Sequence, residues 1–111
     1  IAIAFILRQK WGKKWSNTIL KEVLDECKIR IKNGDEMALT SYYISMIFAI
    51  QEDFDKTFKW LKKSVDQGFL WVDYLNIDPR FDIIRNDKRF NSILQKINLK
   101  LIEENKAIDF L

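Results

Sequence analysis

The chain has few side chains that could act as a nucleophile or hold a transition metal. Its 111 residues include one cysteine, Cys27, and no histidine. A catalytic cysteine needs a cationic or helix N-terminal setting, and usually a histidine partner, to lower its pKa. The common zinc and iron sites also lose their most frequent ligand. Cys27 falls among apolar residues at helical spacing, so we expect a buried thiol that acts as a small hydrophobic side chain.

Paired carboxylates are the other candidates, because two neighbouring acids can divide the roles of general acid and base. The pairs are Asp25 with Glu26, Asp53 with Asp55, and Glu103 with Glu104. All fall at expected helix caps or on polar faces, where a raised pKa is hard to obtain. The three glycines are isolated and form no phosphate-binding loop. We therefore predict that the chain is not an enzyme and uses no metal or cofactor.

The charge of the chain is mildly basic, with a formal net charge of +3 and a pI near 9.0. The lysines are spread over several helix faces, which is typical of a solvated surface. An alternative is weak binding of nucleic acid through Lys10, Lys13, Lys14 and the lysines of residues 56–63. The single cysteine excludes an internal disulfide and favours a reducing compartment, so we expect a cytoplasmic protein.

The composition is typical of one mainly helical domain, so we expect these side chains to be carried by helices. Glycine occurs three times and proline once, and 48% of the residues are hydrophobic. We predict a single all-α domain over residues 1–111, in which residues 16–67 form three helices packed as antiparallel hairpins. The first should begin after an N-cap at Ser16 or Asn17, and the second at Asp35. Gly34 should end the first helix in the left-handed conformation, and Gly68 should close the third helix.

The second and third helices differ in how much of their surface is apolar. In residues 35–51 a stripe of Leu39, Tyr43, Met46 and Ile50 is widened by further apolar residues. A helix of this kind is packed between neighbours. In residues 53–67 the apolar residues form one narrow stripe, and lysines occupy the rest. We expect the second helix to be central and the third to lie at the outer surface.

The sequence repeats a helix-start signal nine residues apart, at Asp78-Pro79-Arg80-Phe81 and at Asp87-Lys88-Arg89-Phe90. Each aspartate can accept backbone N–H bonds at a helix N-terminus, and proline suits the first helical position. Residues 68–99 should therefore form a closing corner and a capping helix, with local ion pairs between its arginines and aspartates. The tail, residues 100–111, should continue as helix.

Residues 38–67 resemble a tetratricopeptide repeat. Phe48 falls on the aromatic position of the first helix, and Thr57, Leu61 and Ser64 fall on the small and large apolar positions of the second. The following run, which includes Leu75, Asp78-Pro79-Arg80-Phe81 and Asp87, resembles the C-terminal end of tetratricopeptide regions in bacterial multidomain regulators. The resemblance implies a short α-solenoid closed by a C-terminal capping helix, acting as a non-catalytic protein-binding scaffold in a regulatory or signalling protein.

Three residues depart from the repeat. Glu52 stands where the helix-breaking glycine is usual, Lys88 where the family ending has a second proline, and Thr57 where a small alanine lets the two helices approach. We expect a slightly wider helix crossing at Thr57.

The expected partner is a protein or peptide bound in a groove between residues 16–33 and 35–51. Tyr42, Ser45 and Phe48 are the candidate lining residues. Trp71 and Tyr74 have two interpretations. With Leu75 they could fold over the open end of the stack as a lid, which an uncapped solenoid would need. Alternatively, Trp71 and Tyr74 border a groove for a peptide.

A purely structural role is the alternative to partner binding. Residues 1–7 are all apolar, and with the C-terminal tail they could form a homo-oligomeric contact. Residues 1–7 are too few to cross a bilayer, which needs about 20 apolar residues. They could be the end of a membrane span that begins upstream, because basic residues follow at once. We expect the chain to be a fragment of a longer protein.

Overall fold

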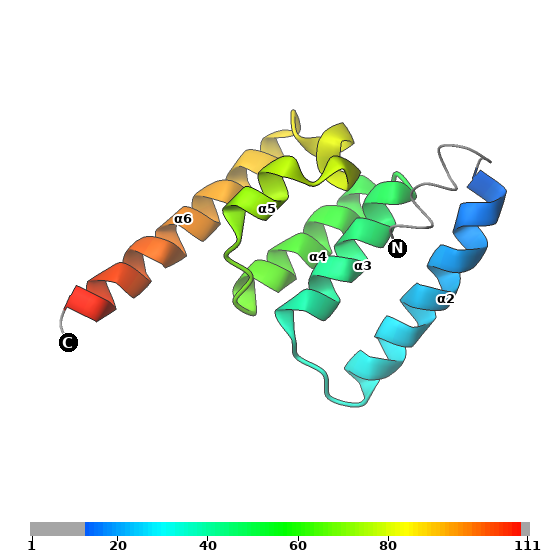
Figure 1. Cartoon of the computed structure of the whole chain (residues 1–111), viewed down its shortest axis with the longest axis horizontal. Coiled ribbons are helices and arrows are strands. Elements are labelled where there is room, and N and C mark those ends of the chain that lie inside the picture. Colours follow the sequence, from blue (N-terminus) through cyan, green and yellow to red (C-terminus); the bar gives the residue numbers. More distant parts are fainter. Residues whose placement is uncertain (1–12, 110–111) are drawn as a thin grey trace.

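The computed structural model describes residues 13–109, with side chains described for residues 17–105. This part of the chain forms helices and turns and contains no β-strand, which confirms the predicted all-helical class. Its elements are α2 (Lys13–Lys32), α3 (Ala38–Ile50), α4 (Phe54–Asp66), α5 (Val72–Ile77), the 3-10 helix η1 (Pro79–Ile84) and α6 (Lys88–Asp109) (Figure 1).

Helix α3 lies at the centre of the molecule. It packs against α2, α4 and η1, and ten of its thirteen residues are buried. Two apolar clusters meet on it. The larger core cluster joins α3 to α4, α5, η1 and α6, and the smaller core cluster joins α3 to α2. The predicted central position of this helix is confirmed, but Tyr43, expected in its buried stripe, is 41% exposed.

Two predicted helix starts are wrong. Helix α2 begins at Lys13, so Ser16 and Asn17 lie within it and do not cap it. Helix α3 begins at Ala38 rather than after Asp35. The Asp35 carboxylate instead accepts hydrogen bonds from the Met37 N–H at 2.7 Å and the Thr40 hydroxyl at 2.9 Å. It stabilises the loop that leads from α2 into α3, because its side chain can bond locally outside a helix.

Helices α2, α3 and α4 end in turns of one kind. After each, a residue with positive φ follows the last helical turn: Gly34 (96°), Glu52 (62°) and Gly68 (110°). The N–H of the next residue then donates to a carbonyl five residues back, at 2.9 Å in all three turns. This Schellman pattern satisfies helix-end carbonyls. The predicted left-handed conformation of Gly34 is confirmed, and Gly68 and Glu52 take the same conformation after α4 and α3.

The closing corner follows its predicted caps. Asp78 accepts from the Arg80 N–H at 3.0 Å with Pro79 at the first position of η1, and Asp87 accepts from the Arg89 N–H at 2.9 Å before α6. Phe69, Leu75 and Phe81 are buried in the larger core cluster.

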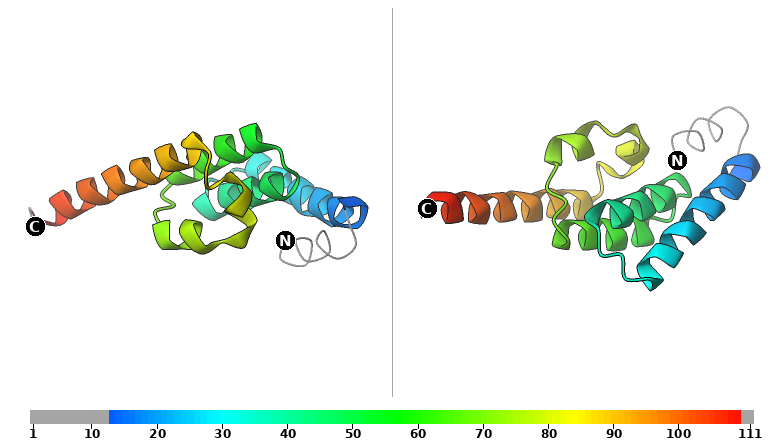
Figure 2. Two further views of the ribbon diagram at one scale, coloured as in Figure 1. Left: turned by 90° about the horizontal axis from the view of Figure 1, so that it is seen from above. Right: turned by 60° about the horizontal axis from the view of Figure 1, so that its bottom comes forward.

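The capping helix predicted after Asp87 is α6, and its inner face buries Phe90, Ile93 and Ile97. The C-terminal half of the helix extends away from the other helices (Figures 1 and 2). Residues 1–7 lie outside the described residues, as do the side chains at the end of the tail, so the predicted homo-oligomeric contact stays a prediction.

Candidate functional site

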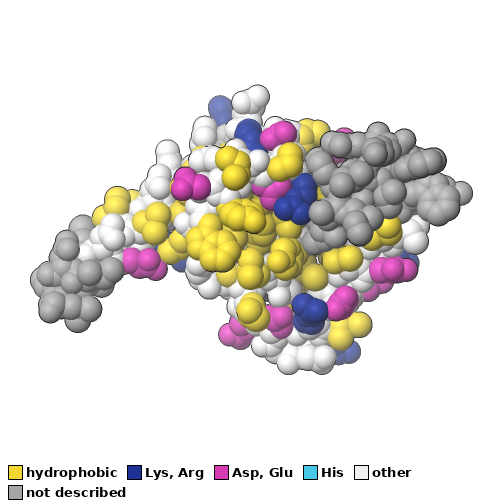
Figure 3. All heavy atoms as spheres, viewed as in Figure 1, with side chains coloured by type: hydrophobic (Ala, Val, Ile, Leu, Met, Phe, Trp, Pro, Cys, Tyr) yellow, Lys and Arg dark blue, Asp and Glu magenta, His cyan; other side chains and the backbone are white. Residues whose placement is uncertain are grey.

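A cavity of about 350 Å³ opens beside α3, α5 and η1. In Figure 3, hydrophobic side chains gather in the middle of the face that carries α3 and α5. The volume falls within the range of small-ligand and peptide-anchor sites. The cavity is lined by Leu39, Tyr42, Tyr43, Met46, Phe69, Trp71, Tyr74 and Arg80.

Buried aromatic rings form the floor of this cavity. The rings of Tyr42 and Phe69 stack with centroids 4.3 Å apart and planes 10° from parallel. Phe81 meets the Tyr42 ring edge-on at 5.6 Å. Met46 closes the floor and is itself buried. Because these side chains belong to the larger core cluster, the floor is fixed by the packing of the fold.

Exposed aromatic side chains form the rim. Trp71 is 59% exposed, Tyr74 56% and Tyr43 41%, and all three line the cavity. The Trp71 ring contacts the floor edge-on at Phe69, with centroids 5.6 Å apart, and lies 6.3 Å from the Tyr74 ring. The lid interpretation is therefore wrong for Trp71 and Tyr74, although Leu75 is buried. The corner covers the core with Phe69 and Leu75, which leaves the two rim side chains in solvent.

A buried polar network lies beneath the aromatic floor. The Tyr42 hydroxyl donates to Oδ2 of Asp78 at 2.8 Å, and the Arg80 guanidinium donates to both oxygens of the same carboxylate at 2.9 and 3.0 Å. Burial opposes ionisation of Asp78, but these hydrogen bonds outweigh it and lower its pKa. Burial and the bond to Asp78 raise the pKa of Tyr42. Asp78 is thus held ionised, and Arg80 is bound within the fold.

The cavity brings together three of the five residues predicted from the sequence: Tyr42, Trp71 and Tyr74. The other two lie in the core. Ser45 is buried and donates to the Tyr42 carbonyl at 2.6 Å. Phe48 is only 7% exposed and packs in the smaller core cluster.

The expected groove between α2 and α3 is therefore closed at Phe48, because Leu20, Leu24 and Cys27 of α2 fill that side of α3. Sequence reasoning missed the other five lining residues of the cavity, which are Leu39, Tyr43, Met46, Phe69 and Arg80. The position of Phe69, directly after the turn at Gly68, is the signal that could have placed it beside α3.

The thiol and the carboxylates of the described residues are placed as structural groups. Cys27 is buried, and burial raises the pKa of its thiol, which disfavours the thiolate. Among the side chains described for residues 17–105, no three carboxylates or thiols are grouped so as to hold a metal ion. None of the helices described over residues 13–109 combines the length and apolar character needed to cross a bilayer.

Comparisons of this chain with protein-family models, curated proteins and solved structures find no match. The cavity and its packing are therefore the features that indicate a function.

Proposed function

We propose that this chain is a non-catalytic protein-binding module that holds a peptide segment in the cavity beside α3 and α5. The observation that carries the proposal is the set of three exposed aromatic side chains, Tyr43, Trp71 and Tyr74, that line the cavity together with a preformed apolar floor. Tryptophan and tyrosine dominate the energetics of protein interfaces, because they offer a large contact area at a small cost in conformational entropy.

The chemistry of the cavity favours an apolar anchor on the partner. The polar groups at its base, those of Tyr42, Asp78 and Arg80, already bond to one another. An incoming polar group would have to displace one of these bonds. An apolar side chain would gain contact with the floor and remove apolar surface from water at about 25 cal/mol per Å². The proposed ligand is therefore a peptide with a large apolar side chain.

The packing of α3 and α4 supports a tetratricopeptide-like hairpin over residues 38–67. Thr57 and Ser64 of α4, at the small positions of the repeat, are fully buried, and Phe48 is buried at the aromatic position of α3. Glu52 has a φ of 62° at the position where the repeat has glycine. In this proposal α2, α3 and α4 form a short antiparallel stack, and residues 68–99 close it. The module serves a larger bacterial regulator in the cytoplasm.

A peptide array tests the function. Wild-type chain and the double variant W71A/Y74A are incubated with the same array of peptides that differ in their apolar residues. We expect the wild type to select peptides with a large apolar anchor and the variant to lose about tenfold or more in affinity for them. Both side chains are more than half exposed, so the variant should fold normally.

The matched control is the double variant I29A/L99A, which removes two other exposed apolar side chains, on α2 and α6. It should bind the selected peptides as the wild type does. Selection of no peptide, or equal loss in the control variant, would rule out this site.

A further inference from the structure

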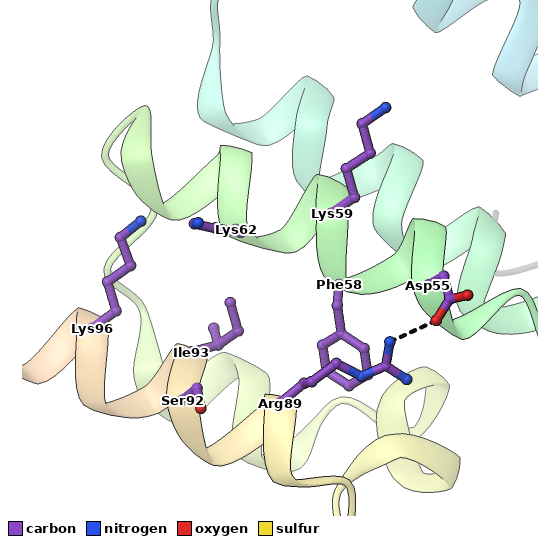
Figure 4. A pocket seen from close by; sticks show the side chains of 8 residues that line it. All are labelled: Asp55, Phe58, Lys59, Lys62, Arg89, Ser92, Ile93 and Lys96. Carbon is purple, nitrogen blue, oxygen red and sulfur yellow. Dashed lines mark hydrogen bonds and ion pairs between the residues drawn. The ribbon is translucent and has the colours of Figure 1, made fainter.

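A second cavity, of about 390 Å³, lies between α4 and α6. We call it the cationic cleft. Figure 4 shows the two helices side by side, with Lys62 and Lys96 at one end of the cleft, Arg89 and Asp55 at the other, and Lys59 extending from the side of α4 away from α6. The lining residues are Asp55, Phe58, Lys59 and Lys62 of α4, and Arg89, Ser92, Ile93 and Lys96 of α6. Along each helix these residues span eight positions, and the seven steps between the first and the last cover about 10 Å, which is roughly two helical turns.

The middle of the cleft is apolar and firmly packed. Phe58 and Ile93 belong to the larger core cluster and form its floor. The Arg89 guanidinium lies over the Phe58 ring, 4.4 Å from its centroid. It also bonds to Asp55 at 2.7 Å and to Asp87 at 3.0 Å. One end of the cleft is therefore held in place by contacts within the chain.

The other end carries positive charge that the chain does not fully balance. Lys62 and Lys96 lie there on opposite helices, at the end away from Arg89 (Figure 4). Lys96 is paired with Asp66. Among the described residues, neither Lys59 nor Lys62 forms an ion pair with a carboxylate. The lining has four cationic side chains, of which Arg89 pairs with Asp55 and Asp87 and Lys96 pairs with Asp66, so the charge without a paired carboxylate is that of Lys59 and Lys62.

We propose that the cationic cleft docks an acidic amphipathic segment of a partner protein. A large apolar side chain of the segment lies over Phe58 and Ile93, and its Asp or Glu residues, within two helical turns, meet Lys59 and Lys62. Charge complementarity of this kind speeds association and selects the partner. This site is separate from the cavity beside α5, with which it shares no lining residue.

Nucleic acid fits the cleft less well. Single-stranded nucleic acid is held by open aromatic faces on which its bases stack. The one aromatic ring in the cleft, that of Phe58, is covered by Arg89. The Asp55 carboxylate at the rim would also repel a phosphate. An apolar floor with lysines at one end favours a carboxylate-bearing peptide.

The test measures binding of a short labelled helical peptide of Leu and Glu by fluorescence anisotropy. The comparison peptide has Gln in place of every Glu. We expect the Leu/Glu peptide to bind the full chain about tenfold or more tightly than the Leu/Gln peptide, with affinity falling as salt is raised. The double variant K59Q/K62Q should weaken binding about fivefold or more. S92E, which adds a negative charge at an exposed rim position, should weaken it too.

The matched control is K21Q/K28Q, which removes two exposed lysines from α2 and should bind like the wild type. W71A/Y74A should also bind normally, so failure of this site and failure of the proposed function are distinguishable. Equal affinity of K59Q/K62Q and wild type would overturn the proposal. Tighter binding of a single-stranded oligonucleotide than of the peptide, lost in K59Q/K62Q, would replace it with nucleic-acid binding.

Discussion

Tyr42 is the residue that connects the centre of the fold to its closing corner. Its ring packs in the larger core cluster, and its hydroxyl donates to Asp78, 36 positions later in the chain. The sequence predicted Asp78 correctly as a helix cap, because a cap depends on the next few residues. The bond to Tyr42 could not be predicted in the same way, since it depends on how α3 and η1 pack. The local sequence therefore identified Asp78 as a helix cap but did not identify its hydrogen bond with Tyr42.

The pH dependence of stability should report the buried Asp78 carboxylate. The pKa of Asp78 is lower in the folded chain than in the unfolded one. The ionised carboxylate therefore stabilises the fold fully above the unfolded pKa of about 3.9, and this stabilisation is lost as the pH falls through the pKa of the folded chain. We expect D78N to cost about 2 kcal/mol at neutral pH, because Arg80 and Tyr42 lose a charged partner. The difference in the free energy of unfolding between D78N and the wild type, measured by urea unfolding, should narrow below about pH 4.

The control for this prediction is D82N, which neutralises an exposed aspartate of the same corner. It should stay within about 0.5 kcal/mol of the wild type at neutral pH. A D78N variant whose deficit stays constant down to pH 3 would show that the carboxylate charge is not what stabilises the corner.

At the scale of elements, the three helix-end turns could be predicted only where glycine marks them. Gly34 and Gly68 indicated where helices end, whereas Glu52 did not, although its turn has the same hydrogen bonds. The start of α3 was misplaced for a related reason. Asp35 is a good capping residue by type, but its carboxylate bonds to Met37 and Thr40 within the loop. Side-chain preference indicates that a boundary is near without fixing its position.

Substitutions at Glu52 and Gly68 should change the free energy of unfolding in opposite directions. A non-glycine residue in the left-handed region costs about 1–2 kcal/mol. E52G should therefore raise the free energy of unfolding by about 0.5–1 kcal/mol, since part of the gain is offset by the more flexible unfolded chain. G68A should lower it by about 1 kcal/mol. Added bulk is not the cause, because a Cβ at Gly68 would meet no atom within 4 Å.

Urea unfolding of both variants measures these changes. E36G is the matched control, because Glu36 has no positive φ and should gain nothing from glycine. A destabilised E52G would mean that the glutamate side chain contributes more than its backbone conformation costs.

At the scale of the whole molecule, α3 separates two cores of unequal size. Helix α2 contacts the rest of the described chain mainly through the smaller core cluster, and most of its surface is in solvent. Helix α3 is buried on both sides. The apolar pattern predicted a central helix correctly, because burial on all sides needs apolar residues all round. It could not predict which of Trp71, Tyr74 and Leu75 faces the core, since the segment is too short to show a period.

Hydrogen exchange should show that α2, held by the smaller core cluster, is less stable than α3. Amides of α2 should exchange faster than those of α3, because a helix held by one small cluster opens at a lower free energy than the helix between two cores. Mass spectrometry of peptides covering residues 17–32 and 40–50 measures both. Equal protection of the two helices would mean that they open only together, as one cooperative unit.

The exposed indole of Trp71 gives the molecule an optical probe of its own cavity. Indole emission shifts to shorter wavelength when water is removed from the ring, and this ring borders the opening while touching Phe69 in the floor. A segment that fills the cavity would dehydrate it. Occupancy can therefore be followed by fluorescence without a label, and a W71F chain, which keeps a ring but lacks this indole, supplies the baseline.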